Sequence, residues 1–189
     1  MSTDNIFEKY DGTTHIETRQ KPGTLFNFGP ASSRDEILYT CERPGGDPEG
    51  GQKIETTTVV REWAAFMKSK GIQRVLVLLS DEELEHYEEP GLMKCYEDSG
   101  FKVYRNPMKV SGSSKNAERL IKEAEAANEK VVAHCTHGMG RSGRVAAGWL
   151  ARKYGLSPQE ATKEAVQTAV EFGMERMGDA KLLEEWLNQ

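Results

Sequence analysis

An apolar run that leads directly into a glycine-containing loop is the feature that most constrains how this chain can fold. Residues 131–133 are Val-Val-Ala, residues 134–140 include two glycines, and apolar residues recur at helical spacing after Arg141. This order predicts a buried strand, a tight loop and a helix. In such a unit the loop amides converge ahead of the helix N-terminus, where free N–H groups and the positive end of the helix dipole bind anions. The stretch therefore predicts a phosphate site.

The loop begins with a cysteine and ends with an arginine. In the field of the converging amides, Cys135 should lose its proton more readily than a free thiol, which makes it a candidate nucleophile. Arg141 can offer a planar fork of donors to two oxygens of a phosphoryl group. Ser142 can donate to the thiolate, or supply a proton when the cysteine leaves. The expected phosphate-binding residues, beside Arg141, are His134, Thr136, His137, Gly138, Met139 and Gly140.

The composition limits the classes of function. The net charge of −5 gives no electrostatic case for general nucleic-acid binding, and no stretch is apolar enough to span a membrane. The only other cysteines, Cys41 and Cys95, are widely spaced, which fits a reducing cytoplasm better than a disulfide framework. They are expected to be structural, a protective disulfide with Cys135 being the other reading. No Cys/His cluster has zinc spacing, so we expect a cytoplasmic protein without metal or cofactor.

The rest of the chain predicts one α/β domain with an extension. Residues 1–35 are polar and rich in turns, and we expect them to pack on a catalytic domain formed by residues 36–189. In that domain strands alternate with helices, which predicts a mainly parallel central sheet flanked by helices on both sides, with ligands at the carboxyl ends of the strands. Strands are expected at 36–41, 74–79, 101–104 and 131–133, and helices at 56–70, 115–129, 141–154, 158–172 and 181–187.

Residues 134–143, His-Cys-Thr-His-Gly-Met-Gly-Arg-Ser-Gly, resemble the signature of the cysteine-dependent protein tyrosine phosphatase superfamily. A looser likeness to its dual-specificity branch extends from about residue 36 to residue 172. The resemblance implies a metal-free, two-step phosphoryl transfer through a cysteinyl-phosphate. It also implies a phosphorylated protein as substrate, with phosphotyrosine first and phosphoserine or phosphothreonine open. A buried structural cysteine beside a helix-capping arginine is the alternative interpretation of the loop.

The usual general acid of that family is missing. It is an aspartate on a mobile loop ahead of the cysteine, but residues 104–114 contain neither Asp nor Glu. Asp81 directly follows the expected buried strand at 74–79 and is therefore our candidate for a displaced acid, although a helix N-cap would explain it equally well. Glu82 and Glu83 are weaker candidates, because they are expected on the surface of the first helical turn.

Two other functions remain open. Residues 134–138 are similar to the loop of cysteine-phosphatase-like RNA 5′-triphosphatases, which also lack the acid. Gly140, however, departs from the asparagine common in that group, and the acidic net charge gives no clear path along which RNA could bind. Nucleic acid is expected as a ligand only in that form. A phosphate-binding module of low activity is the third class: the missing acid favours it, and intact Cys135 and Arg141 disfavour it. Arg43, after an early strand, is either a second phosphate contact or a solvated side chain.

Overall fold

The computed structural model describes residues 6–18 and 23–189. Its centre is a five-stranded sheet in the order β2-β3-β6-β4-β5, in which β2 runs antiparallel to β3 and all other neighbours are parallel. The strands are β2 (Gly29–Pro30), β3 (Leu38–Glu42), β4 (Ile72–Val77), β5 (Lys102–Arg105) and β6 (Lys130–Cys135). β6 lies in the middle, where both faces of the sheet are covered, and this explains its almost continuous apolar sequence.

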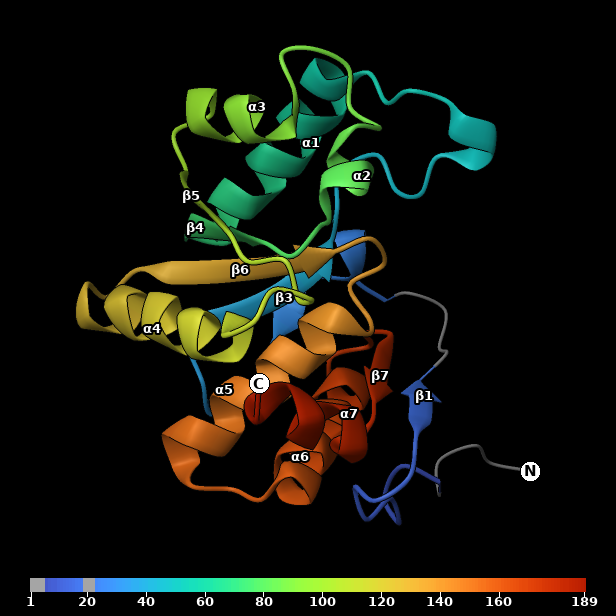
Figure 1. Cartoon of the computed structure of the whole chain (residues 1–189), viewed down its shortest axis with the longest axis vertical. Helices are drawn as coiled ribbons and strands as arrows, with labels where there is room; N and C mark the ends of the chain where they lie inside the picture. The colour runs from blue at the N-terminus through green and yellow to red at the C-terminus, as the bar shows by residue number, and fades with distance from the viewer. Residues whose placement is uncertain (1–5, 19–22) are drawn as a thin grey trace.

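Helices cover both faces of the sheet (Figure 1). One face carries α1 (Thr56–Ser69) and α3 (Leu92–Asp98), and the other carries α4 (Ser113–Ala126), α5 (Arg141–Tyr154), α6 (Pro158–Glu171) and α7 (Ala180–Leu187). Alternate residues of β6 enter two separate cores: Val131 and Ala133 pack with α4 and α5, and Val132 packs with α1 and α3. The predicted fold class, a mainly parallel sheet flanked by helices on both sides, is confirmed.

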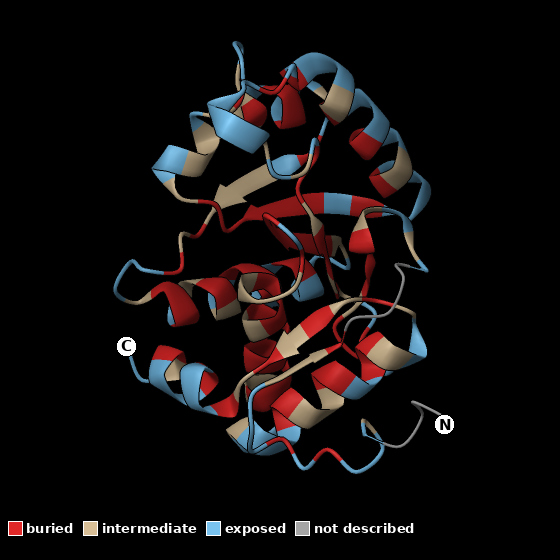
Figure 2. Ribbon diagram, turned by 90° about the vertical axis from the view of Figure 1, so that its right-hand side faces the viewer, coloured by how far each residue is buried: buried red, intermediate tan, exposed pale blue. Residues whose placement is uncertain are grey.

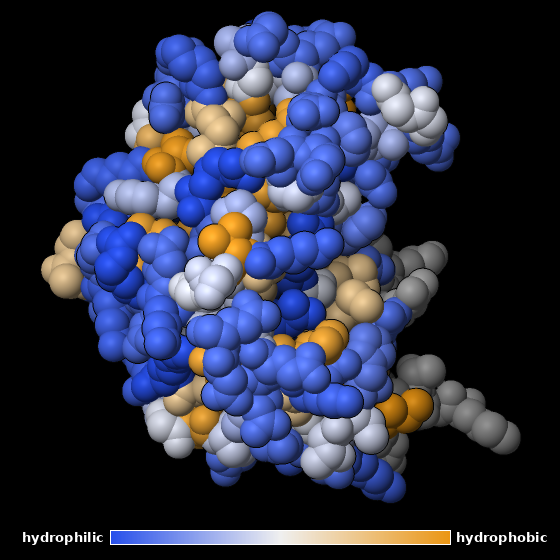
Figure 3. Space-filling view, in the orientation of Figure 1, coloured by the Kyte–Doolittle hydropathy of each residue, from blue (hydrophilic) through white to orange (hydrophobic). Residues whose placement is uncertain are grey.

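Buried residues follow the inner strands and the helix sides that face the sheet, and exposed residues follow the outer turns (Figure 2). The face in Figure 3 is mostly hydrophilic, with apolar side chains reaching it in small separate patches. In the part of the chain that the structure describes, no helix is both long and apolar enough to cross a bilayer.

The N-terminal segment is joined to the body by short strands. β1 (Ile16–Thr18) pairs antiparallel with β7 (Arg176–Gly178), and the 3₁₀ turn η1 (Leu25–Asn27) leads into β2 at the edge of the main sheet. Strand β1 and the segment from η1 to β2 therefore contact the body, while residues 1–5 and 19–22 lie outside the described part. The division of the chain at residue 35 stays a prediction. A second 3₁₀ turn, η2 (Glu49–Gly51), and a one-turn helix, α2 (Asp81–Leu84), complete the chain.

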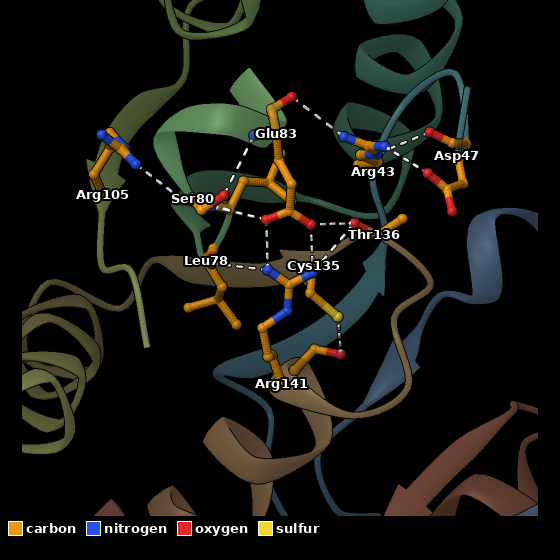
Figure 4. A network of polar contacts seen from close by, with 12 residues as sticks. Arg43, Asp47, Leu78, Ser80, Glu83, Arg105, Cys135, Thr136 and Arg141 are labelled. Carbon is orange, nitrogen blue, oxygen red and sulfur yellow. Dashed lines mark hydrogen bonds and ion pairs between the residues drawn. The ribbon is translucent and has the colours of Figure 1, made fainter. Parts of the chain in front are cut away.

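The ends of the parallel strands place the site. In register, Glu42 of β3 lies opposite Cys135 of β6, and Val77 of β4 lies opposite His134. The loops that follow β3, β4, β5 and β6 therefore share one edge of the sheet. The loop after β6 and the helix α2 after β4 face each other there (Figure 4).

Candidate active site

The loop between β6 and α5 has a backbone that only glycine allows at one position. Gly138 has φ +72°, and a Cβ placed on it would lie 2.6 Å from the carbonyl carbon of Cys41. A side chain there would therefore combine backbone strain with a collision against the end of β3. This contact lets the loop close over the strand and turn back to the first residue of α5.

Cys135 lies at the base of the loop. Its residue is only 3% exposed, and its thiol donates to the hydroxyl of Ser142 across 3.4 Å (Figure 4). Ser142 is itself fully buried in the first turn of α5. The hydroxyl can reverse its role and donate to a thiolate, which is the function expected for Ser142 from the sequence.

Arg141 is held by a carboxylate on α2. Its Nη1 and Nη2 donate to the two carboxylate oxygens of Glu83, each across 2.6 Å, and Nη2 also donates to the hydroxyl of Thr136 across 3.2 Å (Figure 4). The Thr136 hydroxyl in turn donates to Glu83 Oε1 across 2.6 Å. A bidentate charged pair of this kind fixes both the position and the plane of the guanidinium.

Glu83 is ionised in this network. Burial of its carboxyl raises the pKa, but the hydrogen bonds from Arg141, Thr136 and the Ser80 amide outweigh burial and hold the pKa far below its usual range. Glu83 therefore has no proton to give at neutral pH. It positions Arg141 and does not serve as a general acid.

The placement of Glu83 corrects the expectation that it lies on the surface. Its side chain is only 20% exposed. The cause is local, because Ser80 caps α2 and forms a capping box in which the Glu83 carboxylate turns back to accept from the Ser80 amide across 2.8 Å. The Ser-Asp-Glu-Glu pattern contained this signal, since a glutamate at the third helical position of a capping box reaches back toward the helix start.

Asp81, the predicted displaced acid, faces outward from this edge of the sheet. Its side chain is 82% exposed, and its carboxylate accepts from Arg105 Nη1 across 2.7 Å. It takes no part in the network of Glu83, Arg141 and Thr136. Asp81 shares the edge with Cys135, as expected, but the geometry gives no support to its role as acid. Ser80, not Asp81, is the N-cap.

The structure places the His134 side chain away from the expected phosphate-binding residues. It is fully buried on the α1 and α3 face of the sheet, with Nε2 3.0 Å from the Tyr96 hydroxyl. Burial lowers its pKa to about 3, so the imidazole is neutral. His134 therefore supports the loop from the core, and cannot touch a ligand in the pocket.

The other predicted binding residues lie on the loop itself. Thr136 is engaged with Glu83, and His137 is exposed, with Nε2 across 3.7 Å from Asp47. Gly138 is buried against β3, while Met139 and Gly140 are partly exposed. Their contact with phosphate remains a prediction.

Two segments far away in the sequence brace the loop from behind. The amide of Asn27 donates to the carbonyls of His137 and Gly138 across 3.3 and 3.2 Å. The side-chain oxygen of Asn27 accepts from the backbone N–H of Glu175 across 2.8 Å, and the backbone N–H of Met177 donates to the Met139 carbonyl across 3.3 Å. These contacts were missed from the sequence, because neither segment carries a motif or a periodic pattern.

Arg43 has a structural role in the loop after β3. Arg43 is buried and donates to the Gly46 carbonyl and to Asp47, so it is neither the phosphate contact nor the solvated side chain considered from the sequence.

All three cysteines are free. Cys41 packs in the core on the α1 side of the sheet and Cys135 in the core on the α5 side, so a direct disulfide between them would require the backbone to move.

The loop after β5 is held in place without a carboxylate. Asn106 donates to the Ser113 carbonyl across 3.0 Å and accepts from Asn116 across 2.9 Å, which ties the loop to the start of α4.

Within residues 6–18 and 23–189, no group of three His, Cys, Asp or Glu side chains is arranged to hold a metal ion.

Comparison with known proteins places the chain. A family model described as cyclin-dependent kinase inhibitor 3 (CDKN3) matches residues 37–162, which include Glu83, Cys135, Arg141 and Ser142. The chain belongs to the CDKN3 family. The cyclin-dependent kinase inhibitor 3 of Mus musculus is 31% identical over 100 residues, which are 50% of this chain and 47% of that protein. The chain thus spans about half the length of the curated relatives it matches.

Solved structures share the fold. Tk-PTP in its active form is 25% identical, with a TM-score of 0.59, over 84% of this chain and 95% of that one. A kinase-associated phosphatase (KAP), crystallised with its catalytic cysteine replaced by serine, is 22% identical, with a TM-score of 0.58, over 72% and 78% of the two chains. The resemblance to the cysteine-dependent phosphatases and their dual-specificity branch is confirmed.

Proposed function

We propose that the protein is a cysteine-dependent protein phosphatase that hydrolyses phosphotyrosine through a cysteinyl-phosphate. The observation that carries the proposal is the arrangement of Cys135 below a loop whose Arg141 fork is fixed by Glu83. A dianionic phosphoryl group would accept from the loop amides and from the remaining guanidinium donor. Membership of the CDKN3 family and the phosphatase fold support the same reaction.

The reaction would run in two steps. The Cys135 sulfur forms a bond to phosphorus as the ester P–O bond breaks, and the bonding pair leaves with the substrate oxygen. Water then attacks phosphorus, the S–P bond breaks, and its electron pair returns to sulfur while the water proton goes to solvent. Ser142 donates a hydrogen bond to the departing sulfur, and Arg141 stabilises the equatorial oxygens in both steps.

The missing general acid selects the substrate. No carboxylate occupies residues 104–114, Glu83 is ionised, and Asp81 points outward. The leaving oxygen must therefore depart without a proton from a positioned acid, which a phenolate does far more readily than the alkoxide of serine or threonine. We infer a preference for phosphotyrosine, with slower action on phosphoserine and phosphothreonine.

The partner is a phosphorylated protein, and a phosphorylated protein kinase is the first class to test, since the relatives are named for their association with kinases. A cytoplasmic location is proposed from the dispersed, unpaired cysteines. An RNA 5′-triphosphatase is not favoured, because the family match and the acidic charge balance both oppose it. A non-catalytic binding module is also disfavoured by the buried contact of Cys135 with Ser142.

The test is hydrolysis in the presence of a chelator. An aryl phosphate, a phosphotyrosine peptide, a phosphothreonine peptide and a 5′-triphosphate RNA would be compared, using wild type, Cys135→Ser and the control Cys95→Ser. We expect cleavage of the aryl phosphate and the phosphotyrosine peptide, loss of both in Cys135→Ser, and normal activity in Cys95→Ser. Cleavage of the RNA alone would replace the proposal by the triphosphatase, and inactivity on all four substrates would replace it by the binding module.

A further inference from the structure

A buried arginine lies behind the phosphate loop without a carboxylate partner. Arg176 is the first residue of β7 and is 0% exposed. Its Nη2 donates to the Thr40 hydroxyl across 2.8 Å, but its Nε and Nη1 have no hydrogen-bond partner. Within the part of the chain that the structure describes, no Asp or Glu forms an ion pair with it. Burial of an unpaired charge is costly, so a negative charge nearby is expected to compensate it.

The position of the guanidinium indicates which group that is. A Cβ placed on Gly143 would lie 2.8 Å from Arg176 Cδ and 3.6 Å from its Nη1, so the side chain passes directly under the first turn of α5. Ser142, which accepts from the Cys135 thiol, is the neighbour of Gly143 in that turn. Thr40, which holds the other side of the guanidinium, lies opposite Ala133 on β6, two residues before Cys135. Arg176 is thus enclosed between β3, β6 and the start of α5, behind Cys135.

Three arginines lie close enough for a negative Cys135 to interact with them, and they differ in whether a carboxylate balances their charge. Arg141 forms an ion pair with Glu83. Arg144 is partly exposed, and the negative charges of Asp179 and Glu185 act on it. Arg176 has neither solvent nor carboxylate. Burial lowers the pKa of Arg176 to about 10 and a negative Cys135 opposes this, so the guanidinium stays charged at neutral pH.

The remaining titratable neighbours do not supply the missing charge. Cys41 is buried on the other face of the sheet, and burial raises the pKa of its thiol well above the usual range, so it stays neutral. His134 is also neutral, because burial lowers its pKa to about 3. Glu83 is committed to Arg141 and Thr136. Cys135 is the neighbour whose negative form would favour the charged guanidinium of Arg176.

We propose that Arg176 is a positioning residue for catalysis, which holds Cys135 in the thiolate form from behind the loop without touching the substrate. Its charge acts through buried protein, where screening by solvent and salt is weak. Arg141 can then be used for the phosphoryl oxygens while Arg176 serves the sulfur. The benefit to turnover rests on the proposed function, whereas the effect on the thiol does not.

The experiment reads the thiol directly. Wild type, Arg176→Gln, Arg176→Met and Arg176→Lys would be alkylated with iodoacetamide across pH 4 to 9, and modification of Cys135 would be followed by peptide mass spectrometry. Gln retains a donor for Thr40 without the charge, Met removes both, and Lys keeps the charge. Arg74→Met is the matched control, because Arg74 is also buried but lies at the other end of the sheet, paired with Glu129.

In the two neutral variants we expect the pH of half-reaction to rise by about one unit, while Lys and the Arg74 control stay near wild type. Hydrolysis of an aryl phosphate at pH 6 should fall by up to about tenfold in the neutral variants and recover as pH rises. A folded neutral variant with a wild-type alkylation profile would overturn the proposal and leave Arg176 a packing role, and so would an equal shift in Arg74→Met. If the alkylation profile shifts but no variant, wild type included, cleaves any phosphate ester, the proposed function fails and the assignment of Arg176 stands.

Discussion

Glu83 binds both terminal nitrogens of Arg141, each across 2.6 Å. The carboxylate comes from a helix of one turn, and the guanidinium comes from the first residue of α5. The pair therefore joins the loop after β4 to the phosphate loop, and it fixes the plane of the guanidinium, whose remaining donor would bind the phosphoryl group in the proposed reaction. Preorganisation of this kind lowers the reorganisation required at the transition state.

Replacing Glu83 by glutamine tests this arrangement. Glu83→Gln keeps the shape of the side chain but removes the charge. The amide NH2 group cannot accept a hydrogen bond, so one of the two guanidinium nitrogens loses its acceptor. Loss of a charged hydrogen bond costs about 1.5–3 kcal/mol, so we expect kcat/KM for an aryl phosphate to fall roughly 10- to 100-fold. Steady-state kinetics measure this, with the exposed neighbour in Glu82→Gln as control. An increase in kcat/KM would instead mean that Glu83 blocks the fork.

Asp81 offers a separate test of the missing acid. Its carboxylate is exposed and paired with Arg105, and an exposed pair contributes about 0–1 kcal/mol. We therefore expect Asp81→Asn to retain kcat within about twofold on both good and poor leaving groups, because acid catalysis would be worth roughly 100-fold or more.

The measurement is a series of aryl phosphates whose phenols differ in acidity. Without a proton donor, the rate of wild type should depend steeply on the leaving group, and Asp81→Asn should give the same slope. A rate loss in Asp81→Asn that grows as the leaving group becomes poorer would restore Asp81 as the acid.

Gly138 tests the closure of the loop over β3. In Gly138→Ala the added Cβ would combine φ +72° with a 2.6 Å contact to the carbonyl carbon of Cys41. Gly100→Ala is the matched control, because Gly100 has φ +90° but no atom within 4 Å of the added Cβ. The strain alone costs about 1–2 kcal/mol. We expect both variants to lose that stability in urea unfolding, and only Gly138→Ala to lose activity, since the backbone that lines the phosphate site must move. Equal kinetics for the two variants would contradict the role of the contact.

The sequence predicted those parts of the site that are local in the chain. Cys135, Ser142 and Arg141 lie in one ungapped motif between an apolar strand and a helix, so the spacing alone places them together. The start of α6 at Pro158 agrees with the helix expected at 158–172, and the structure shows that Ser157 and Glu160 form a capping box there.

The parts that were missed depend on contacts between distant segments. Asn27 and Arg176 come from a 3₁₀ turn and a strand of three residues, which are too short to show a periodic pattern, and only tertiary packing brings them behind the loop. Glu83 was misjudged for a different reason. The sequence placed Glu83 in the first turn of a helix, which is correct. We expected its side chain on the surface, whereas it turns back toward Ser80 and the loop.

The buried His134 predicts how stability depends on pH. Burial lowers its pKa from the ordinary 6.5 to about 3. Between these values the unfolded chain binds a proton that the folded protein does not, so stability is lost as pH falls below 6.5, by about 1.4 kcal/mol per pH unit. The lowered pKa of Glu83 acts in the same direction but only below its ordinary 4.5. The exposed His15, whose pKa is raised by hydrogen bonds to Glu17 and Asp179, acts weakly in the opposite direction.

Urea unfolding of wild type and His134→Gln between pH 7 and pH 5 isolates the effect of His134. Glutamine can still bond to the Tyr96 hydroxyl but does not titrate, so its variant should be less stable than wild type at pH 7 and should lose less stability toward pH 5. The difference between the two free energies of unfolding should shrink by about 2 kcal/mol across this range, because the proton taken up by the unfolded wild type has no counterpart in the variant. If the free energies of unfolding of the two proteins changed in parallel with pH, His134 would have to be protonated in the folded state. The core behind Cys135 would then hold a charged imidazole.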